Sequence, residues 1–575
     1  MTRACRVVPD LTAVDRAFDY SVPPALGARL RVGTMVRVPL HGRRVRGWVV
    51  ADDVEPEAGE LLDVLAVVSA GPSPDVVALS EWIAWRWCGP RVAVLRSASP
   101  PNNVPVATHS GEPASLDYRI GSSLTPVRVV RRAPLLERRE VVADLCAADG
   151  STIVCVADAG RARALTAYLR EQGRNGVLLH SVEADAARTE AWGRAARGSV
   201  VVVGGRVAAL APVPDLRAAV VVDDADEALQ EERSPTWHAR DVLVERAGRA
   251  GAPVTVLSPA PTPEVITLAG GRVDAPARDV EQHGWPRVQV VDRRAEPPGA
   301  GILTDELVTA LRHAKGLAVC VLNRRGRFRL LACAPNQHLV RWDRGADRPL
   351  ICPECGATKL RVLRAGVTRL TEELAAILPD RTVVDVDADT TDIPAADIVI
   401  GTEAVLHRSR IRRRRPVLVA YLDLDQELLA PRYRAAAQAH WLLTRGAQLL
   451  AARPRAETML LVQTRVPDHV VVRALVEGDP SLVTGAELEY RTMLAYPPFG
   501  ALAELTGEDK PLITAADALR ALDVQSTGVV AFGPADGRLL VNAPTWAVLA
   551  DALARAVPAG RAHGRLRAAV DPPRV

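Results

Sequence analysis

The sequence predicts a multidomain α/β protein in which two lobes, each built on a buried parallel sheet, make up most of the chain. Three observations indicate this. The 575 residues are too many for one hydrophobic core, 48% of them are hydrophobic, and short valine-rich runs alternate with helical stretches from about residue 150 onward. Because helices cover both faces of a parallel sheet, its strands read as continuous apolar runs.

The first lobe is expected at residues 126–275 and the second at residues 276–475. Helices such as Ala159–Arg170, His238–Arg249 and the long Arg434–Leu450 separate the strands. The expected strands are Thr152–Val156, Val177–His180, Val200–Val203, Ala218–Val222 and Val254–Leu257 in the first lobe, and Leu317–Leu322, Thr382–Val386, Ile398–Ile400 and Val417–Leu422 in the second.

Smaller domains are expected on either side of the lobes. Residues 1–100 look β-rich, with apolar runs around a turn at His41–Arg44, followed by a tryptophan-rich helix at Ser80–Trp87. Residues 101–125 are rich in Pro, Ser, Asn and Gly, which predicts a linker, and residues 476–575 show an α+β pattern. The N-terminus has no apolar signal core and the chain has no long apolar run, so we expect a cytoplasmic protein without a membrane span.

Eight cysteines are spread along the chain, and only Cys352 and Cys355 are closely paired. Two thiolates on a tight turn can reach one tetrahedral zinc ion, and Gly356 permits the turn. In a long chain without a signal sequence this pattern indicates metal binding rather than disulfides. The cysteine region at about residues 320–366 interrupts the second lobe as an insert.

Several short segments, in the same order along the chain, resemble the primosomal protein N′ helicases, the PriA family of replication restart proteins. The resemblance implies two RecA-like parallel-sheet lobes with a zinc-binding insert, a β-rich N-terminal domain that binds the 3′ end of a nascent strand, and a C-terminal α+β domain. It rests on Phe18-Asp19-Tyr20, Trp237–Asp241, Gly401-Thr402-Glu403, Asn323–Gly326 and Tyr496–Gly500.

Helicases of this class hydrolyse ATP with a glycine-rich loop that ends in Gly-Lys-Thr or Gly-Lys-Ser. The chain has only three lysines, Lys315, Lys359 and Lys510, and none precedes a serine or threonine. The segment where the loop belongs, Val127–Gly150, has no glycine before its last residue. Arginine is a poor substitute for that lysine, since its guanidinium is a planar fork and not a compact charge.

The remaining motor motifs are altered as well. Asp223 follows the last apolar strand residue and could bind magnesium, whereas Asp224 replaces a longer glutamate; a solvated acidic strand end is the alternative. Prolines enter the coupling loop at Ser258–Pro261, and Leu450 takes the place of one of two arginine fingers, leaving Arg453. We therefore expect no ATP or Mg²⁺ cofactor, no ATP hydrolysis and no unwinding.

The resemblance also implies zinc ligands and DNA contacts. Cys333 matches a first ligand, so that Cys333, Cys352 and Cys355 would hold one Zn²⁺ together with His338, Asp343 or water; a metal-free loop is the alternative.

In the N-terminal domain, Phe18, Asp19 and Tyr20 would line a pocket for a 3′-terminal nucleotide, although Phe18 and Tyr20 could equally be strand core. The most cationic stretch would contact phosphates or form a solvated loop, and it contains Arg412, Arg413, Arg414 and Arg415.

The sequence thus leads to one main hypothesis and two alternatives. The main hypothesis is a replication restart protein that binds forked DNA without ATP turnover. By resemblance, its partners are primosome proteins, single-strand binding protein and the replicative helicase. The alternatives are an active ATP-dependent 3′–5′ helicase with atypical motifs and a zinc-knuckle adaptor that binds proteins and not DNA.

Overall fold

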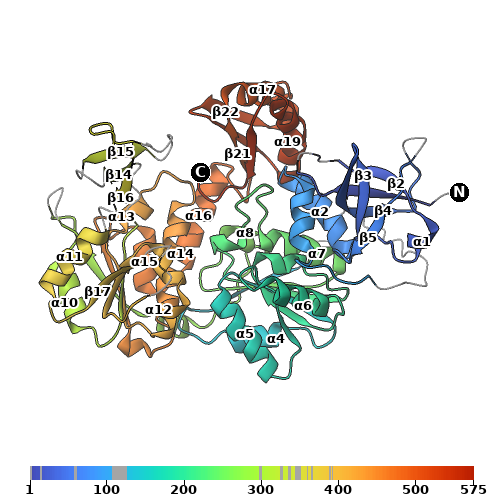
Figure 1. Ribbon diagram of the computed structural model, residues 1–575. Coiled ribbons are helices and arrows are strands. Elements are labelled where there is room, and N and C mark those ends of the chain that lie inside the picture. Colours follow the sequence, from blue (N-terminus) through green and yellow to red (C-terminus); the bar gives the residue numbers. More distant parts are fainter. Residues whose placement is uncertain are drawn as a thin grey trace. The chain divides into compact units, whose positions relative to one another are not determined.

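The computed structural model (Figure 1) describes residues 3–12, 14, 16–56, 61–106, 126–296, 301–323, 328–333, 338–343, 351–358, 360–363, 367–386, 390 and 393–575. Most of the expected linker at 101–125 and parts of the cysteine insert lie outside these residues. Among the described residues, no helix is both long enough and apolar enough to span a membrane.

The N-terminal domain is a five-stranded antiparallel sheet with the order β2-β1-β4-β3-β5. The hairpin of β3 and β4 turns at His41 and Gly42, whose φ angles of 46° and 75° suit a two-residue turn between twisted strands. The tryptophan-rich helix starts earlier than expected, because Pro74 occupies its first turn. The elements are β1 (Ala4–Pro9), β2 (Phe18–Ser21), α1 (Pro24–Gly27), β3 (Met35–Leu40), β4 (Arg43–Asp52), β5 (Ala66–Ser69), α2 (Pro74–Arg86) and α3 (Arg91–Ala98).

The first lobe is a six-stranded parallel sheet ordered β6-β11-β10-β7-β9-β8. Neighbouring residues of β10 face opposite sides: Val220 packs with α4 and α5, and Val221 packs with α7. Helices therefore cover both faces, as the valine-rich strands predict. The elements are β6 (Val127–Arg131), α4 (Arg139–Leu145), β7 (Ser151–Val156), α5 (Ala159–Glu171), β8 (Gly176–Leu178), α6 (Asp185–Ala195), β9 (Val201–Gly204), η1 (Arg206–Leu210), β10 (Leu216–Val222), η2 (Glu227–Leu229), α7 (Ala239–Ala250), β11 (Val254–Ser258) and α8 (Pro263–Leu268).

The second lobe repeats this arrangement with the order β12-β20-β19-β13-β18-β17. Counted from the first strand of each sheet, both lobes have the order 1-6-5-2-4-3, although the sequence shows no internal repeat. Cys320 of β13 is buried in the core with α10 and α11. The elements are α9 (Arg278–His283), β12 (Arg287–Asp292), α10 (Asp305–His313), β13 (Ala318–Val321), α11 (Val367–Ile377), β17 (Val383–Val386), β18 (Ile398–Gly401), η3 (Glu403–His407), α12 (Ser409–Arg413), β19 (Leu418–Tyr421), α13 (Asp425–Leu428), α14 (Ala435–Leu449), η4 (Arg455–Glu457), β20 (Met459–Thr464), α15 (Val470–Glu477) and α16 (Ser481–Met493).

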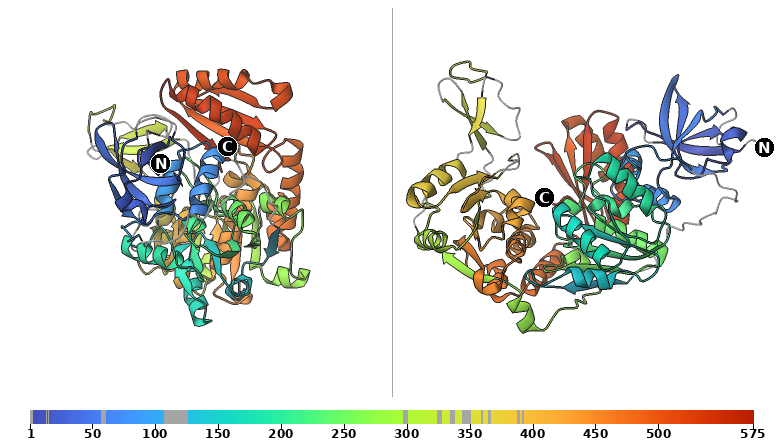
Figure 2. Two further views of the ribbon diagram at one scale, coloured as in Figure 1. Left: turned by 90° about the vertical axis from the view of Figure 1, so that its right-hand side faces the viewer. Right: turned by 60° about the horizontal axis from the view of Figure 1, so that its bottom comes forward.

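The cysteine insert and the C-terminal domain each form an antiparallel sheet. The insert lies between β13 and α11 and has the order β15-β14-β16, separate from the lobe sheet (Figure 2). The C-terminal domain has the element order βαββαβ and the sheet order β22-β23-β21-β24, which is a ferredoxin-like arrangement. The elements are β14 (Phe328–Cys333), β15 (Leu339–Asp343), β16 (Leu360–Leu363), β21 (Ala501–Gly507), α17 (Asp509–Arg520), α18 (Val524–Thr527), β22 (Val530–Ala535), β23 (Arg538–Ala543), α19 (Trp546–Arg561) and β24 (Leu566–Val570).

The chain divides into two compact units. Unit 1 comprises Met1–Arg131, Glu137–Ala275 and Glu487–Val575, and unit 2 comprises Arg132–Leu136 and Pro276–Ala486. Within unit 1, the C-terminal domain packs against α2. The Arg86 guanidinium lies 3.8 Å from the centre of the Trp546 ring, and the Trp85 indole donates a hydrogen bond of 2.8 Å to Asp551.

Candidate functional site

Asp223 and Asp224 directly follow β10, at the carboxyl edge of the first lobe's sheet. The alternative of a solvated strand end is wrong for both residues, because only 4% of Asp223 and 1% of Asp224 is exposed. Asp223 also has a positive φ of 60°, which is uncommon for a residue other than glycine. A buried carboxylate in such a conformation requires compensating partners nearby.

Two arginines hold the Asp223 carboxylate. Arg138 donates from Nη1 to Oδ1 at 2.7 Å, and Arg161 donates from Nη1 to Oδ2 at 3.0 Å. Arg161 lies in the first turn of α5, which begins here because the Asp158 side chain accepts a hydrogen bond of 2.8 Å from the Arg161 amide. Arg138 directly precedes α4. Both carboxylate oxygens of Asp223 therefore already have a cationic donor.

Asp224 is bound to the loop after β11. Thr262 donates to its Oδ2 from the hydroxyl at 2.5 Å and from the amide at 3.2 Å, while Oδ1 is buried without a hydrogen-bond partner among the described residues. Burial raises the pKa of the Asp224 carboxyl to about 6, against the lowering effect of the Thr262 hydrogen bonds and of Arg240. Thr262, which directly follows the altered Ser258–Pro261 segment, therefore contacts Asp224.

The segment expected to hold phosphates keeps the strand, loop and helix of a phosphate-binding loop but not its chemistry. It runs from β6 through residues 132–138 into α4, without glycine or lysine. Ala133 is buried in the core that contains Trp285, and the Leu135 amide donates to the Gly284 carbonyl at 2.9 Å. The Leu135 amide is therefore already used in a hydrogen bond within the protein.

The arginine-finger region is also committed to internal contacts. Leu450 is fully buried in the core of the second lobe. The remaining Arg453 donates to the Arg415 carbonyl at 2.9 Å and to Glu457 at 3.2 Å. In this structure Arg453 thus supports the chain around Arg415.

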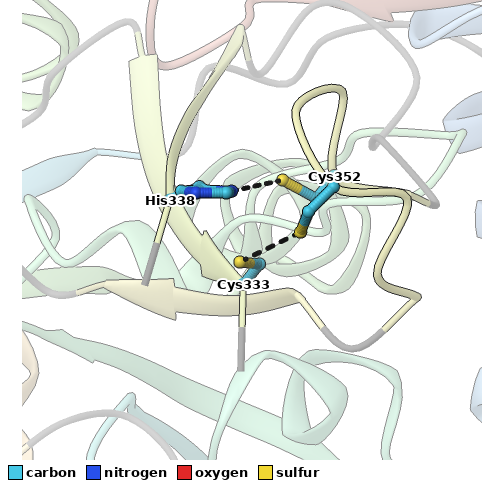
Figure 3. A group of neighbouring side chains, drawn as sticks. Cys333, His338 and Cys352 are labelled. Carbon is cyan, nitrogen blue, oxygen red and sulfur yellow. Dashed lines mark hydrogen bonds between the residues drawn. The ribbon is translucent and has the colours of Figure 1, made fainter. Parts of the chain in front are cut away.

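The insert brings four possible metal ligands together, because the donor atoms of Cys333, His338, Cys352 and Cys355 all lie within 4.8 Å of one another. Figure 3 shows three of them, Cys333, His338 and Cys352. Sγ of Cys333 is 3.6 Å from Sγ of Cys355, and Sγ of Cys352 is 3.8 Å from Nδ1 of His338. Zn–S bonds of about 2.3 Å place two thiolates of a tetrahedral site about 3.8 Å apart. The four side chains could hold one metal ion with the spacing that zinc requires.

The three aromatic and acidic residues of β2, the edge strand, do not share one environment. Tyr20 is 3% exposed and its hydroxyl donates to the Pro39 carbonyl at 3.0 Å. Phe18 is half-buried with the Arg16 guanidinium 4.5 Å from its ring centre, and Asp19 accepts hydrogen bonds of 2.8 and 3.2 Å from Arg6. Tyr20 therefore belongs to the core in this conformation, and contact of the three residues with a nucleotide stays a prediction.

Four successive arginines, Arg412–Arg415, lie at the end of α12 and directly after it, and they differ in exposure. Arg413 and Arg415 are exposed, and Arg412 is half-buried. Arg414 is held by the chain, because it donates to the carbonyls of Pro394 and Ala396. The surface available to a phosphate backbone is therefore made mainly by Arg413 and Arg415.

A family model described as the 3′ DNA-binding domain (3′BD) of PriA matches residues 6–100. The probable replication restart protein PriA of Mycobacterium leprae is 29% identical over 86% of each chain, and that of Mycobacterium tuberculosis (strain H37Rv) is 29% identical over 91% of this chain and 89% of its own. The chain is thus similar to PriA replication restart proteins over most of its length. The replication restart protein PriA of Bacillus subtilis is 27% identical over 60% of this chain and 48% of its own.

These matches confirm the resemblance to PriA proteins read from the sequence, and the two parallel six-stranded sheets confirm the expected pair of lobes. Among solved structures, a DEAD box protein from Methanococcus jannaschii matches with 11% identity and a TM-score of 0.30, covering 61% of this chain and 85% of its own. Dbp5 of Saccharomyces cerevisiae bound to RNA and ADP BeF3 matches with 10% identity and a TM-score of 0.35, covering 63% and 83%.

Sequence reasoning missed the partners of the acidic pair. Arg138 is 85 residues from Asp223 and Arg161 is 62 residues from it, so no local spacing connects them. Thr262 lies 38 residues beyond Asp224. The one local signal is the arginine pair Arg138-Arg139, which follows a segment without lysine or glycine.

We predict that Asp224→Asn stabilises unit 1 at high pH. The folded-state pKa of about 6 exceeds the ordinary 3.8, so ionisation above pH 6 costs folded-state stability that an amide, which cannot ionise, avoids. The gain in the free energy of unfolding is expected to be about 3 kcal/mol near pH 8, to decrease between about pH 6 and pH 4, and to vanish below about pH 4. Thermal unfolding at both pH values measures it, with exposed Asp144→Asn as the control. A loss of stability near pH 8 would contradict the burial penalty.

Proposed function

We propose that the protein binds forked DNA with a free 3′ end and supports replication restart without hydrolysing ATP or unwinding DNA. The match of residues 6–100 to the PriA 3′ DNA-binding domain carries the DNA half of this proposal. The family resemblance adds primosome proteins, single-strand binding protein and the replicative helicase as proposed partners.

The ATP half of the proposal is supported by the loop between β6 and α4. A phosphate-binding loop uses successive free amides and a lysine to neutralise the β and γ phosphates. Here the loop has neither glycine nor lysine, and the Leu135 amide is already bonded to Gly284. An arginine finger contributes ~10³–10⁵ in rate, and buried Leu450 cannot act as one.

The DNA half assigns different tasks to the residues of β2. Phe18 is only half-buried on an edge strand, so its ring can stack on a terminal base. The Asp19 carboxylate can accept a hydrogen bond from a free 3′ hydroxyl while Arg6 keeps it oriented. Buried Tyr20 would position the strand through its hydrogen bond to Pro39.

We expect the protein to prefer a fork with a free 3′ hydroxyl over the same fork with a blocked 3′ end, and to show no DNA-stimulated ATP hydrolysis. Asp19→Ala should reduce that preference by about tenfold, the value of one charge-assisted hydrogen bond. Fluorescence anisotropy and an ATPase assay on the same sample measure both properties. The control is Asp52→Ala, which breaks the ion pair with Arg3 in the same sheet.

The claim of fork binding and the claim of no ATP hydrolysis can be contradicted separately. Magnesium-dependent ATP turnover that forked DNA stimulates and Asp223→Asn abolishes would identify an active helicase. Equal affinity for forked and blunt duplex DNA would remove the DNA half and favour a zinc-knuckle adaptor.

The exposed arginines near α12 are proposed to neutralise DNA phosphates. Arg413→Glu combined with Arg415→Glu should lower fork affinity by at least about tenfold, and should reduce the slope of log affinity against log salt by about 2, because about two phosphate contacts are lost. The control is Arg473→Glu, an exposed arginine of α15 that pairs with Glu477. An affinity and a salt slope equal to those of the unaltered protein would exclude the contact.

We also propose that Cys333, His338, Cys352 and Cys355 hold one Zn²⁺ that fixes the insert. When bound, zinc would cross-link β14, the segment before β15 and the turn at Cys352–Gly356. Gly356 has a φ of 70°, and its amide donates to the Cys352 carbonyl at 2.8 Å, which forms the tight turn that carries Cys352 and Cys355.

Elemental analysis of chelator-washed protein should find about one zinc per chain, and Cys352→Ser should lose most of it because three ligands bind zinc far more weakly. Cys88→Ser, a half-buried cysteine outside the cluster, should keep the metal. Equal zinc content in the two variants would contradict the assignment.

A further inference from the structure

The resemblance to PriA helicases implies that Asp223 would bind the magnesium ion of a nucleotide complex. The ion pairs of Asp223 place two arginines at this carboxylate instead. Both guanidinium groups are largely withdrawn from solvent, with side-chain exposures of 15% for Arg138 and 18% for Arg161, and the Asp223 side chain is 5% exposed. Each oxygen of the carboxylate accepts a charge-assisted hydrogen bond. Permanent positive charge therefore already stands where an aspartate would meet a metal ion.

The residues around Asp223 do not fit a magnesium nucleotide. Magnesium needs near-octahedral oxygen ligands at about 2.0–2.1 Å and keeps several waters, so it requires an open carboxylate oxygen and space beside it. Arg138 and Arg161 occupy both oxygens, and arginine does not lose its proton in a protein. The segment before Arg138, residues 132–137, contains neither glycine nor lysine, so its sequence is not that of a phosphate-binding loop.

We propose that Arg138 and Arg161 are a built-in counter-ion that replaces the metal at Asp223. The two guanidinium groups tie the start of α4 and the first turn of α5 to the end of β10, so the first lobe keeps its active-site edge ordered without nucleotide. This proposal rests on the proposed function, since it gives the physical reason why ATP is not required. It also goes beyond it, because it assigns a structural role to two arginines that the proposed function does not use.

The unusual backbone of Asp223 agrees with this role. Its φ of 60° carries a conformational cost that persists only where the surroundings hold it. The Asp223 amide donates to the Leu257 carbonyl at 3.0 Å, and its carboxylate is fixed on the other side by the arginines. In this backbone conformation the Asp223 carboxylate contacts the guanidinium groups of Arg138 and Arg161.

A manganese titration followed by electron paramagnetic resonance tests whether the metal is displaced. Mn²⁺ alone is added to the full-length protein and to Asp223→Asn, without nucleotide or DNA. We expect the two to bind the same number of ions. One Mn²⁺ bound by the unaltered protein and lost in Asp223→Asn would overturn the proposal. Because the titration contains neither DNA nor ATP, a result that overturns this proposal says nothing about fork binding or ATP turnover. Failure of this proposal and failure of the proposed function can therefore be told apart.

Thermal unfolding tests whether the arginines stabilise the lobe. Arg138→Ala and Arg161→Ala should each lower the Tm by roughly 5 °C or more, because each leaves a buried carboxylate under-compensated. The matched control, Arg163→Ala, lies on the same helix as Arg161 but pairs with Glu183 at the surface and should shift the Tm by roughly 1 °C or less. Equal shifts in the three variants would overturn the proposal. A variant that fails to fold while Arg163→Ala folds would support it.

Discussion

The burial of the Asp223 carboxylate is the constraint on which the arrangement of side chains at the carboxyl edge of the first lobe's sheet depends. Moving an unpaired carboxylate out of water costs several kcal/mol in a protein interior, so a cation must accompany it. A motor enzyme obtains that cation with its nucleotide. In this chain Arg138 and Arg161 supply it from segments 85 and 62 residues away, and they join a loop and a helix to the central strand β10.

The second lobe satisfies the polar groups at its corresponding edge in a similar way. In open α/β sheets, ligands bind beyond the carboxyl ends of the strands. In the second lobe, Asn323 follows β13, accepts from the Glu403 amide at 2.8 Å and donates to Glu427 at 3.3 Å. Asp425, after β19, accepts from the Thr464 hydroxyl and the Arg465 amide. In both lobes the chain itself therefore provides the partners at the edge where ligands usually bind.

The sequence predicts the strands of the fold where their residues are continuously apolar. It predicts the candidate metal site because two of the possible ligands, Cys352 and Cys355, are close in sequence. The strands β7, β10 and β11 consist mostly of buried apolar residues and were expected within two residues of their ends. In contrast, β6 (Val-Arg-Val-Val-Arg) and β12 (Arg-Val-Gln-Val-Val-Asp) were not expected, because polar residues interrupt them and both lie at sheet edges. The paired Cys352 and Cys355 pointed to a metal site. The arginines that hold Asp223 could not be found, because only the parallel sheet brings them together.

The division of the chain has a consequence for the order in which the protein is made. Unit 2 is inserted into unit 1, whose last segment, Glu487–Val575, completes the packing begun by α2. The Thr236 hydroxyl, for example, donates to the Val570 carbonyl across 334 residues at 2.9 Å. A ribosome synthesises the chain from the N-terminus, and domains fold as their residues emerge. Unit 2 is therefore complete before unit 1, and the packing of unit 1 can close only after β24 has been synthesised.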